Sequence, residues 1–144
     1  MQNNNFHRTI TVKASPGEAL KKISQVDLWW AKTFSGSAEK LNDKFTVTFG
    51  KTFVDFQIKE LVPNKKVVWQ VTDCHLDWIN NKKEWNDTEV VFEVLEKENA
   101  TQILFTHIGL VPEVECYTDC EVGWTGHITN SLVMLITEGK GMPE

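Results

Sequence analysis

One long helical pattern follows a run of strand patterns in this chain of 144 residues. From Lys44 to Ile108 apolar and polar residues alternate, which is typical of β-strands, and a helical pattern then extends from about Val114 to Thr137. A single long helix can bury its apolar stripe only against the apolar face of such a sheet. The order therefore predicts a curved antiparallel sheet wrapped around the helix, with a cavity between them.

Six runs of alternating residues supply the strands of this predicted sheet. They are Phe6–Val12, Lys44–Phe49, Thr52–Glu60, Lys66–Thr72, Thr88–Leu95 and Thr101–Ile108. One apolar and one polar face in each run indicates an antiparallel sheet that is covered on one side. Residues 35–37 and 73–87 are expected to be loops. The second loop carries Trp78 and Trp85, which could mark an interface or a lid.

Two short helices are expected after the first strand. Ser15 is suited to cap a helix, Pro16 to its first position, and Glu18 to the last position of a capping box. A further helical turn is predicted over residues 26–32, where it carries Trp29 and Trp30.

The long C-terminal helix should turn one stripe toward the sheet. At 100° per residue, that stripe contains Tyr117, Cys120, Trp124, Ile128, Ser131, Leu132 and Leu135. Gly123 and Gly126 each weaken a helix by up to about 1 kcal/mol relative to alanine. They could allow close approach to the sheet or leave room for a ligand, or they could have no special role in a well-packed helix.

Composition excludes several classes of function. The net charge is −5 and no cluster of Lys and Arg stands out, which argues against nucleic acid as a partner. No apolar run approaches the roughly 20 residues of a membrane span, and the first residues lack the features of a signal peptide, so a cytoplasmic protein is expected. Cys74, Cys116 and Cys120 fit reduced thiols. Their spacing matches no zinc pattern and no cofactor motif is present, so neither a metal nor a cofactor is expected.

The inward faces of the strands and the helix stripe define the candidate ligand site. Its apolar members are Phe45, Phe56, Trp69, Phe92, Phe105, Trp124 and Ile128, with Trp30 and Phe34 closing one end. The polar groups with inward parity are Arg8, His107, His127 and Ser131. Arg8 could pair with a ligand carboxylate or could simply reach solvent. An apolar cavity with a few convergent polar groups is typical of a small-molecule site. The alternative is that these side chains simply fill the core.

Several stretches of the chain resemble a known superfamily. They are Phe105-Thr106-His107-Ile108-Gly109-Leu110, Cys120-Glu121-Val122-Gly123-Trp124, Trp29-Trp30 and the run from Glu60 to Trp69. With these stretches the chain resembles the START-like (SRPBCC, birch-pollen-allergen-like) superfamily. Within it, the chain is similar to homologues of the C-terminal domain of the activator of heat-shock-protein-90 ATPase. The resemblance extends from Phe6 to Gly139 and implies one α+β domain over residues 1–144 with the helix-grip fold.

The resemblance leaves three functions open. The first is binding of a small hydrophobic or amphipathic molecule between the sheet and the helix. The second is an enzyme of the polyketide cyclase or dehydratase type, with His107 or His127 as acid/base. The third is a domain that binds a chaperone or another protein of a stress response. The chaperone activator has a separate N-terminal domain for which this sequence offers no counterpart, so chaperone activation is not expected.

Overall fold

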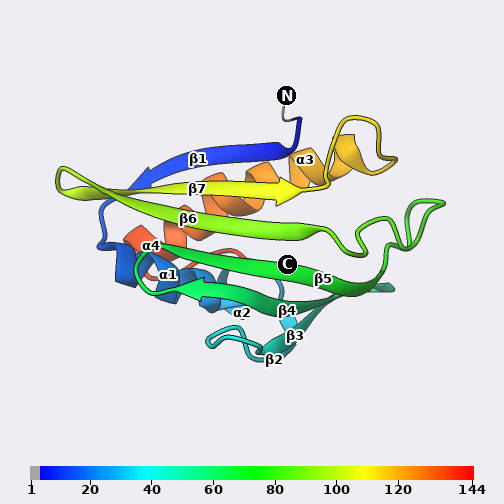
Figure 1. The fold of residues 1–144 in the computed structure, drawn as a ribbon, viewed down its shortest axis with the longest axis horizontal. Helices are drawn as coiled ribbons and strands as arrows, with labels where there is room; N and C mark the ends of the chain where they lie inside the picture. Colours follow the sequence, from blue (N-terminus) through cyan, green and yellow to red (C-terminus); the bar gives the residue numbers. More distant parts are fainter. Residues whose placement is uncertain (1–3) are drawn as a thin grey trace.

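The computed structural model describes residues 4–144. Residues 1–3, which contributed to the prediction that a signal peptide is absent, lie outside the described residues. In this part of the chain one antiparallel sheet has the strand order β1-β7-β6-β5-β4-β3-β2 (Figure 1). Its strands are β1 (Phe6–Val12), β2 (Thr33–Gly36), β3 (Lys44–Phe49), β4 (Thr52–Val62), β5 (Lys66–His75), β6 (Glu89–Lys97) and β7 (Ala100–Ile108).

The helices lie together on one face of the sheet (Figure 1). They are α1 (Pro16–Ser24), α2 (Val26–Trp29), α3 (Tyr117–Gly126), the π-helical segment η1 (His127–Leu132) and α4 (Val133–Glu138). Because α3, η1 and α4 follow one another without a break, they form one long helix that crosses the sheet. This arrangement confirms the predicted helix-grip fold.

The sheet curves around the helix because its strands twist and because β4 carries irregularities. The register between β4 and β5 shifts between Asp55 and Phe56 and again between Ile58 and Glu60. A bulge adds a residue to one strand and bends it there. The concave face carries fully buried side chains from β4 to β7, including Phe56, Trp69, Phe92 and Phe105.

The start of α1 follows its predicted capping. The Ser15 hydroxyl accepts a hydrogen bond from the Glu18 amide at 3.1 Å, and Pro16 occupies the first turn. The Trp29 indole at the end of α2 is fully buried and donates to the Ile23 carbonyl at 3.0 Å. The two short helices are therefore fixed to each other by a buried hydrogen bond.

Two of the predicted loop boundaries are wrong. Residues 33–36 form the short edge strand β2, in which Gly36 pairs with Phe45 and a Cβ would clash with the Lys44 carbonyl. β5 extends to His75, and its last residues pair with Phe53 and Val54 beyond the bulge. The edge strand has no alternating pattern and the bulge interrupts the alternation, so neither strand segment was visible in the sequence.

The long helix begins at Tyr117, three residues later than predicted. The preceding residues, Val111–Cys116, form turns instead, one of which is closed by the hydrogen bond from the Val114 amide to the Val111 carbonyl. The predicted stripe is otherwise confirmed, since the following residues are buried: Cys120, Trp124, Ile128, Ser131, Leu132 and Leu135. Tyr117 is only half-buried. The π-helical turn over His127–Leu132 was not predicted.

Candidate functional site

A cavity of about 330 Å³ lies between the long helix, the β3–β4 hairpin and the loop of residues 76–88. Its apolar lining consists of Trp30, Phe49, Val54, Leu76, Trp78, Trp85, Cys120, Gly123 and Trp124. Its polar lining consists of Thr52, Asp119, His127 and Glu144. Four of the six tryptophans of the chain therefore border this single space.

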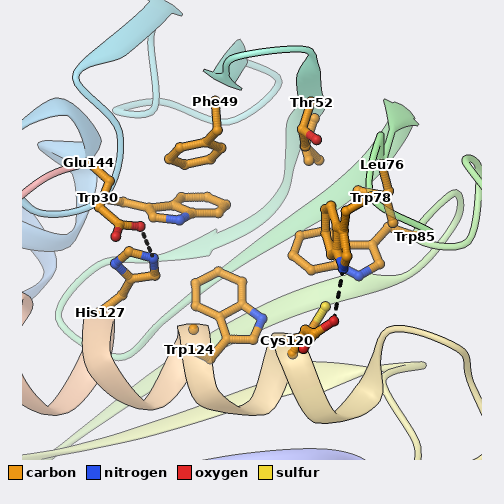
Figure 2. A pocket seen from close by; sticks show the side chains of 13 residues that line it. Trp30, Phe49, Thr52, Leu76, Trp78, Trp85, Cys120, Trp124, His127 and Glu144 are labelled. Atoms are coloured by element: carbon orange, nitrogen blue, oxygen red, sulfur yellow. Dashed lines mark hydrogen bonds and ion pairs between the residues drawn. The ribbon is translucent and has the colours of Figure 1, made fainter.

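Aromatic rings form a continuous arc along one wall of the cavity (Figure 2). The ring centroids of Phe49 and Trp30 are 5.9 Å apart, those of Trp30 and Trp124 4.8 Å, and those of Trp124 and Trp85 6.0 Å. These separations are typical of aromatic rings in contact. The arc gives the cavity a rigid, largely apolar surface.

The two helix glycines differ in what they border. A Cβ built on Gly123 or on Gly126 would meet nothing within 4 Å, so neither glycine is there for close approach to the sheet. Gly123 lines the cavity and Gly126 does not. The missing side chain at Gly123 therefore leaves space on the cavity floor.

A chain of hydrogen bonds fixes Trp124 to the loop through His107. The Trp124 indole N–H donates to His107 Nδ1 at 3.1 Å, and His107 Nε2 lies 2.9 Å from the Thr88 hydroxyl. Because an indole nitrogen can only donate, Nδ1 accepts and the imidazole proton resides on Nε2. The Thr88 hydroxyl in turn donates to the Trp85 carbonyl at 2.7 Å. Complete burial lowers the pKa of His107 to about 3, so this imidazole stays neutral.

Two carboxylates bind the loop to the start of the helix in reciprocal fashion. The Glu84 carboxylate accepts from the amides of Glu115 and Cys116, both at 2.8 Å. The Glu115 carboxylate accepts from the amides of Asn80 and Asn81 at 2.9 and 3.0 Å. These amide bonds hold the pKa of Glu115 below its usual value. We call this pair of carboxylates the Glu84–Glu115 clasp.

The loop tryptophans contact α3 and the residue before it through their indole nitrogens. Trp85 is buried and donates to Cys116 Sγ at 3.3 Å. Trp78 is 48% exposed and donates to the Asp119 carboxylate at 3.1 Å. The hydrogen bond with Cys116, together with burial, raises the pKa of the Cys120 thiol, which makes it a poor nucleophile at neutral pH.

The last residues of the sequence close the other end of the cavity. The Glu144 amide donates to the Trp30 carbonyl at 3.0 Å, and the Glu144 carbonyl accepts from the Lys32 amide at 2.8 Å. Ser131, which is buried, donates to the Trp29 carbonyl at 2.6 Å and accepts from the Met142 amide at 2.7 Å. This segment therefore packs on α2 and the long helix.

Glu144 also faces His127 across the rim of the cavity. His127 Nε2 lies 3.5 Å from the Glu144 carboxylate, as Figure 2 shows. Burial lowers the pKa of His127, and the nearby Glu144 charge offsets part of this shift. His127 therefore presents a predominantly neutral ring to the cavity at neutral pH.

The structure brings three of the predicted site residues together at the cavity, namely Trp30, Trp124 and His127. The following six are packed in the core: Phe45, Phe56, Trp69, Phe92, Phe105 and Ile128. Phe34 is half-buried against Phe45 on the edge of the sheet. His107 and Ser131 are buried and use their polar atoms in the internal hydrogen bonds described above.

Most of the cavity lining lay outside the sequence prediction. Phe49, Thr52 and Val54 come from the β3–β4 hairpin, and Leu76, Trp78 and Trp85 come from the loop. The pair of tryptophans in an otherwise polar segment was the sequence signal for the loop: Trp78 and Trp85 were expected to mark an interface or a lid, and both line the cavity.

The described residues, 4–144, carry neither a metal-ligating cluster nor a disulfide. In that range no group of three or more His, Cys, Asp and Glu side chains has the arrangement of a metal site. The three cysteines there are free and buried. None of the helices described is long and apolar enough to cross a bilayer.

The curved sheet that grips one long helix, with a cavity between them, is the helix-grip fold, and the solved structures similar to this chain are consistent with the START-like (SRPBCC) superfamily. No protein-family model matches the sequence, and no curated protein matches it. Among solved structures the chain is similar to the Aha1 dimer from Colwellia psychrerythraea, with 27% identity and a TM-score of 0.77 over 95% of this chain and 98% of that one. This similarity confirms the resemblance to the chaperone-activator homologues within the superfamily.

Two more distant neighbours share the fold. DynU16, a putative protein in the dynemicin biosynthetic locus, is 14% identical with a TM-score of 0.73, over 97% of this chain and 49% of that one. CalU16 from Micromonospora echinospora is 16% identical with a TM-score of 0.68, over 92% of this chain and 73% of that one. At these identities the likeness concerns the fold alone.

Proposed function

We propose that this protein binds a small, largely apolar molecule in the cavity between the long helix and the loop of residues 76–88. The observation that carries the proposal is the arc of aromatic rings around a space of about 330 Å³. This volume is at the lower end of the range of small-molecule pockets, and aromatic walls with few polar groups are typical of them.

Two features favour a ligand over a core that is merely incompletely filled. Gly123 stands in the middle of α3 although it weakens a helix, and its position borders the cavity. Trp78 is held over the cavity by Asp119 while half of its surface remains in water. A bound apolar molecule would cover this indole and fill the space at Gly123.

Binding is favoured over acid/base catalysis because His107 is unsuited to such a role. It is fully buried, both of its nitrogens are hydrogen-bonded within the protein, and it does not line the cavity. His127 is the imidazole that borders the space. Of the two histidines considered for catalysis, only His127 is therefore placed to act on a molecule in the cavity.

The proposal is tested by filling the cavity from Gly123. We expect Gly123→Leu to abolish the fluorescence enhancement of the neutral apolar probe N-phenyl-1-naphthylamine, because the leucine side chain would occupy the floor of the cavity. Gly126→Leu is the matched control, since Gly126 lies in the same helix and also has open space for a Cβ but does not line the cavity.

Both leucine variants should be folded and no less stable than the wild type, because leucine is a better helix former than glycine by up to about 1 kcal/mol. Circular dichroism and thermal unfolding check this. The proposal is wrong if the probe does not bind the wild type, or if both variants bind it as the wild type does.

A further inference from the structure

The charged side chains that line the cavity are all acidic. Asp119 lies at one end and Glu144 at the other, and neither Lys nor Arg occurs among the lining residues found in the described chain. The rest of the lining is apolar or aromatic, apart from Thr52 and His127. The cavity thus combines an aromatic wall with negative charge at its rim.

Among residues 4–144, neither carboxylate forms an ion pair with a lysine or an arginine. Asp119 accepts from the Trp78 indole, which is an uncharged donor. Glu144 faces His127 at 3.5 Å, but burial lowers the pKa of His127, so the imidazole carries little charge near pH 7. Both carboxylates therefore keep a charge that a ligand can meet.

The lysines of the loop are engaged elsewhere. Lys82 Nζ donates to the carbonyls of Asp77 and Ile79, both at 2.6 Å. Lys83 Nζ pairs with Asp73 at 3.0 Å. An anionic ligand in the cavity would consequently meet two carboxylates with no lysine or arginine from the lining to balance them.

Aromatic rings add a second attraction for positive charge. The face of an indole is negative, so a cation within about 6 Å of it is stabilised, and the effect increases when water is excluded. Trp30, Trp124 and Trp85 lie side by side along the wall, and Trp78 lies beside Asp119 (Figure 2). Indoles and carboxylates together form the recognition elements typical of an ammonium group.

We infer that the ligand of this cavity is cationic, with an amine or quaternary ammonium group attached to an apolar body. The inference rests on the proposed function and specifies its ligand class. The apolar body would contact the arc from Phe49 to Trp85, and the cation would lie toward Asp119 or Glu144.

The experiment compares three probes that share a benzyl group: benzyltrimethylammonium, benzyl alcohol and phenylacetate. Binding is followed by NMR through the indole N–H signals of the six tryptophans. We expect the cation to bind about tenfold more tightly than the neutral or anionic probe. It should perturb the indole signals of Trp78, Trp85 and Trp124 more than that of Trp69, which is packed in the core.

Charge-removing variants then identify the source of the preference. Asp119→Asn and Glu144→Gln should each weaken binding of the cation about fivefold and leave benzyl alcohol unaffected. Glu121→Gln and Glu138→Gln are the control variants, since each removes one negative charge from the long helix at a position that does not line the cavity. Added salt should weaken binding of the cation alone.

The outcomes separate this inference from the proposed function. If benzyl alcohol binds in a Gly123-dependent manner and the cation binds no more tightly, the inference is wrong and the cavity still binds apolar molecules. Retention of the full preference for the cation in the Asp119→Asn/Glu144→Gln double variant also overturns the inference. If none of the three probes binds while N-phenyl-1-naphthylamine does, the inference is wrong and the proposed function stands. If N-phenyl-1-naphthylamine does not bind either, both fail.

Discussion

At the scale of single residues, the direction of the hydrogen bonds determines what His107 can do. The Trp124 indole N–H requires an acceptor at Nδ1. His107 Nε2–H therefore donates a hydrogen bond to the Thr88 hydroxyl, which in turn donates to the Trp85 carbonyl. A proton added at Nδ1 would face the indole N–H and break the first of these bonds. His107 is therefore a structural link between Trp124 and the loop.

We predict that His107 remains neutral, as the Nε2–H tautomer, from pH 7 to below pH 5. Nitrogen-15 NMR of the imidazole measures both properties. The pKa of His107 falls from 6.5 to about 3 on folding. As the pH is lowered, the imidazole therefore becomes protonated in the unfolded chain before it does so in the folded protein. Stability should therefore rise with pH between about 3 and 6.5, by up to about 1.4 kcal/mol per pH unit from this group.

The variant His107→Gln isolates this contribution. Glutamine can donate and accept hydrogen bonds but does not titrate, so the pH dependence of the free energy of unfolding, measured with urea, should become flatter by about one proton in that window. Titration of His107 in the folded wild type near pH 6.5 would contradict the prediction.

The sequence indicated part of this arrangement. Alternation along β7 placed His107 inward, and helical spacing placed Trp124 toward the sheet. Their direct hydrogen bond and the participation of Thr88 depend on the position of the helix along the direction of the strands. The periodicity of the sequence does not determine that position. The sequence pattern therefore could not predict that His107 forms hydrogen bonds with Trp124 and Thr88.

At the scale of elements, the Glu84–Glu115 clasp determines the position of the loop of residues 76–88. This loop has no strand pairing of its own, and it carries Trp78 and Trp85 over the cavity. Glu84 holds the turn before the long helix by accepting from the amides of Glu115 and Cys116, the two residues that precede Tyr117. A carboxylate near this end of a helix is also favoured by the helix dipole.

Glu84→Ala should destabilise the protein by about 1 kcal/mol, because it leaves the amides of Glu115 and Cys116, in the turn before the helix, without their acceptor. It should also accelerate hydrogen exchange of the amides of Glu115 and Cys116. Urea unfolding and exchange followed by NMR measure these effects. Glu113→Ala, at an exposed carboxylate in the turns before the same helix, serves as the control. Equal stability of the two variants would show that the clasp does not support the loop.

Regular elements were predictable and their irregularities were not. The strands that alternate cleanly and the helix capped by Ser15 follow from local rules. The edge strand β2, the end of β5 beyond the bulge and the π-helical turn at His127–Leu132 depend on pairing and packing with distant residues. Of these irregular segments, the π-helical turn supplies His127 to the cavity, and the end of β5 leads directly into Leu76, which also lines it.

At the scale of the whole molecule, the fold and the cavity have different origins. The fold follows from one long amphipathic helix and a sheet with one apolar face. The cavity lies at one end of their interface, where Gly123 has no side chain and the loop carries Trp78 and Trp85 over the space. The alternation of the strands and the helical spacing identify every side chain between the sheet and the helix as a candidate. They therefore selected Phe92 and Phe105, which are packed in the core, together with Trp124, which lines the cavity.

A ligand in this cavity should stabilise the folded protein as a whole, because it would contact the helix, the hairpin and the loop at once. At ten times its dissociation constant, N-phenyl-1-naphthylamine should add about 1.4 kcal/mol to the free energy of unfolding. For a domain of this size the gain corresponds to a rise in Tm of roughly 5 °C. Differential scanning calorimetry measures the shift, which should be retained in Gly126→Leu and absent in Gly123→Leu. A shift of equal size in both variants would mean that the probe stabilises the protein from another place on its surface.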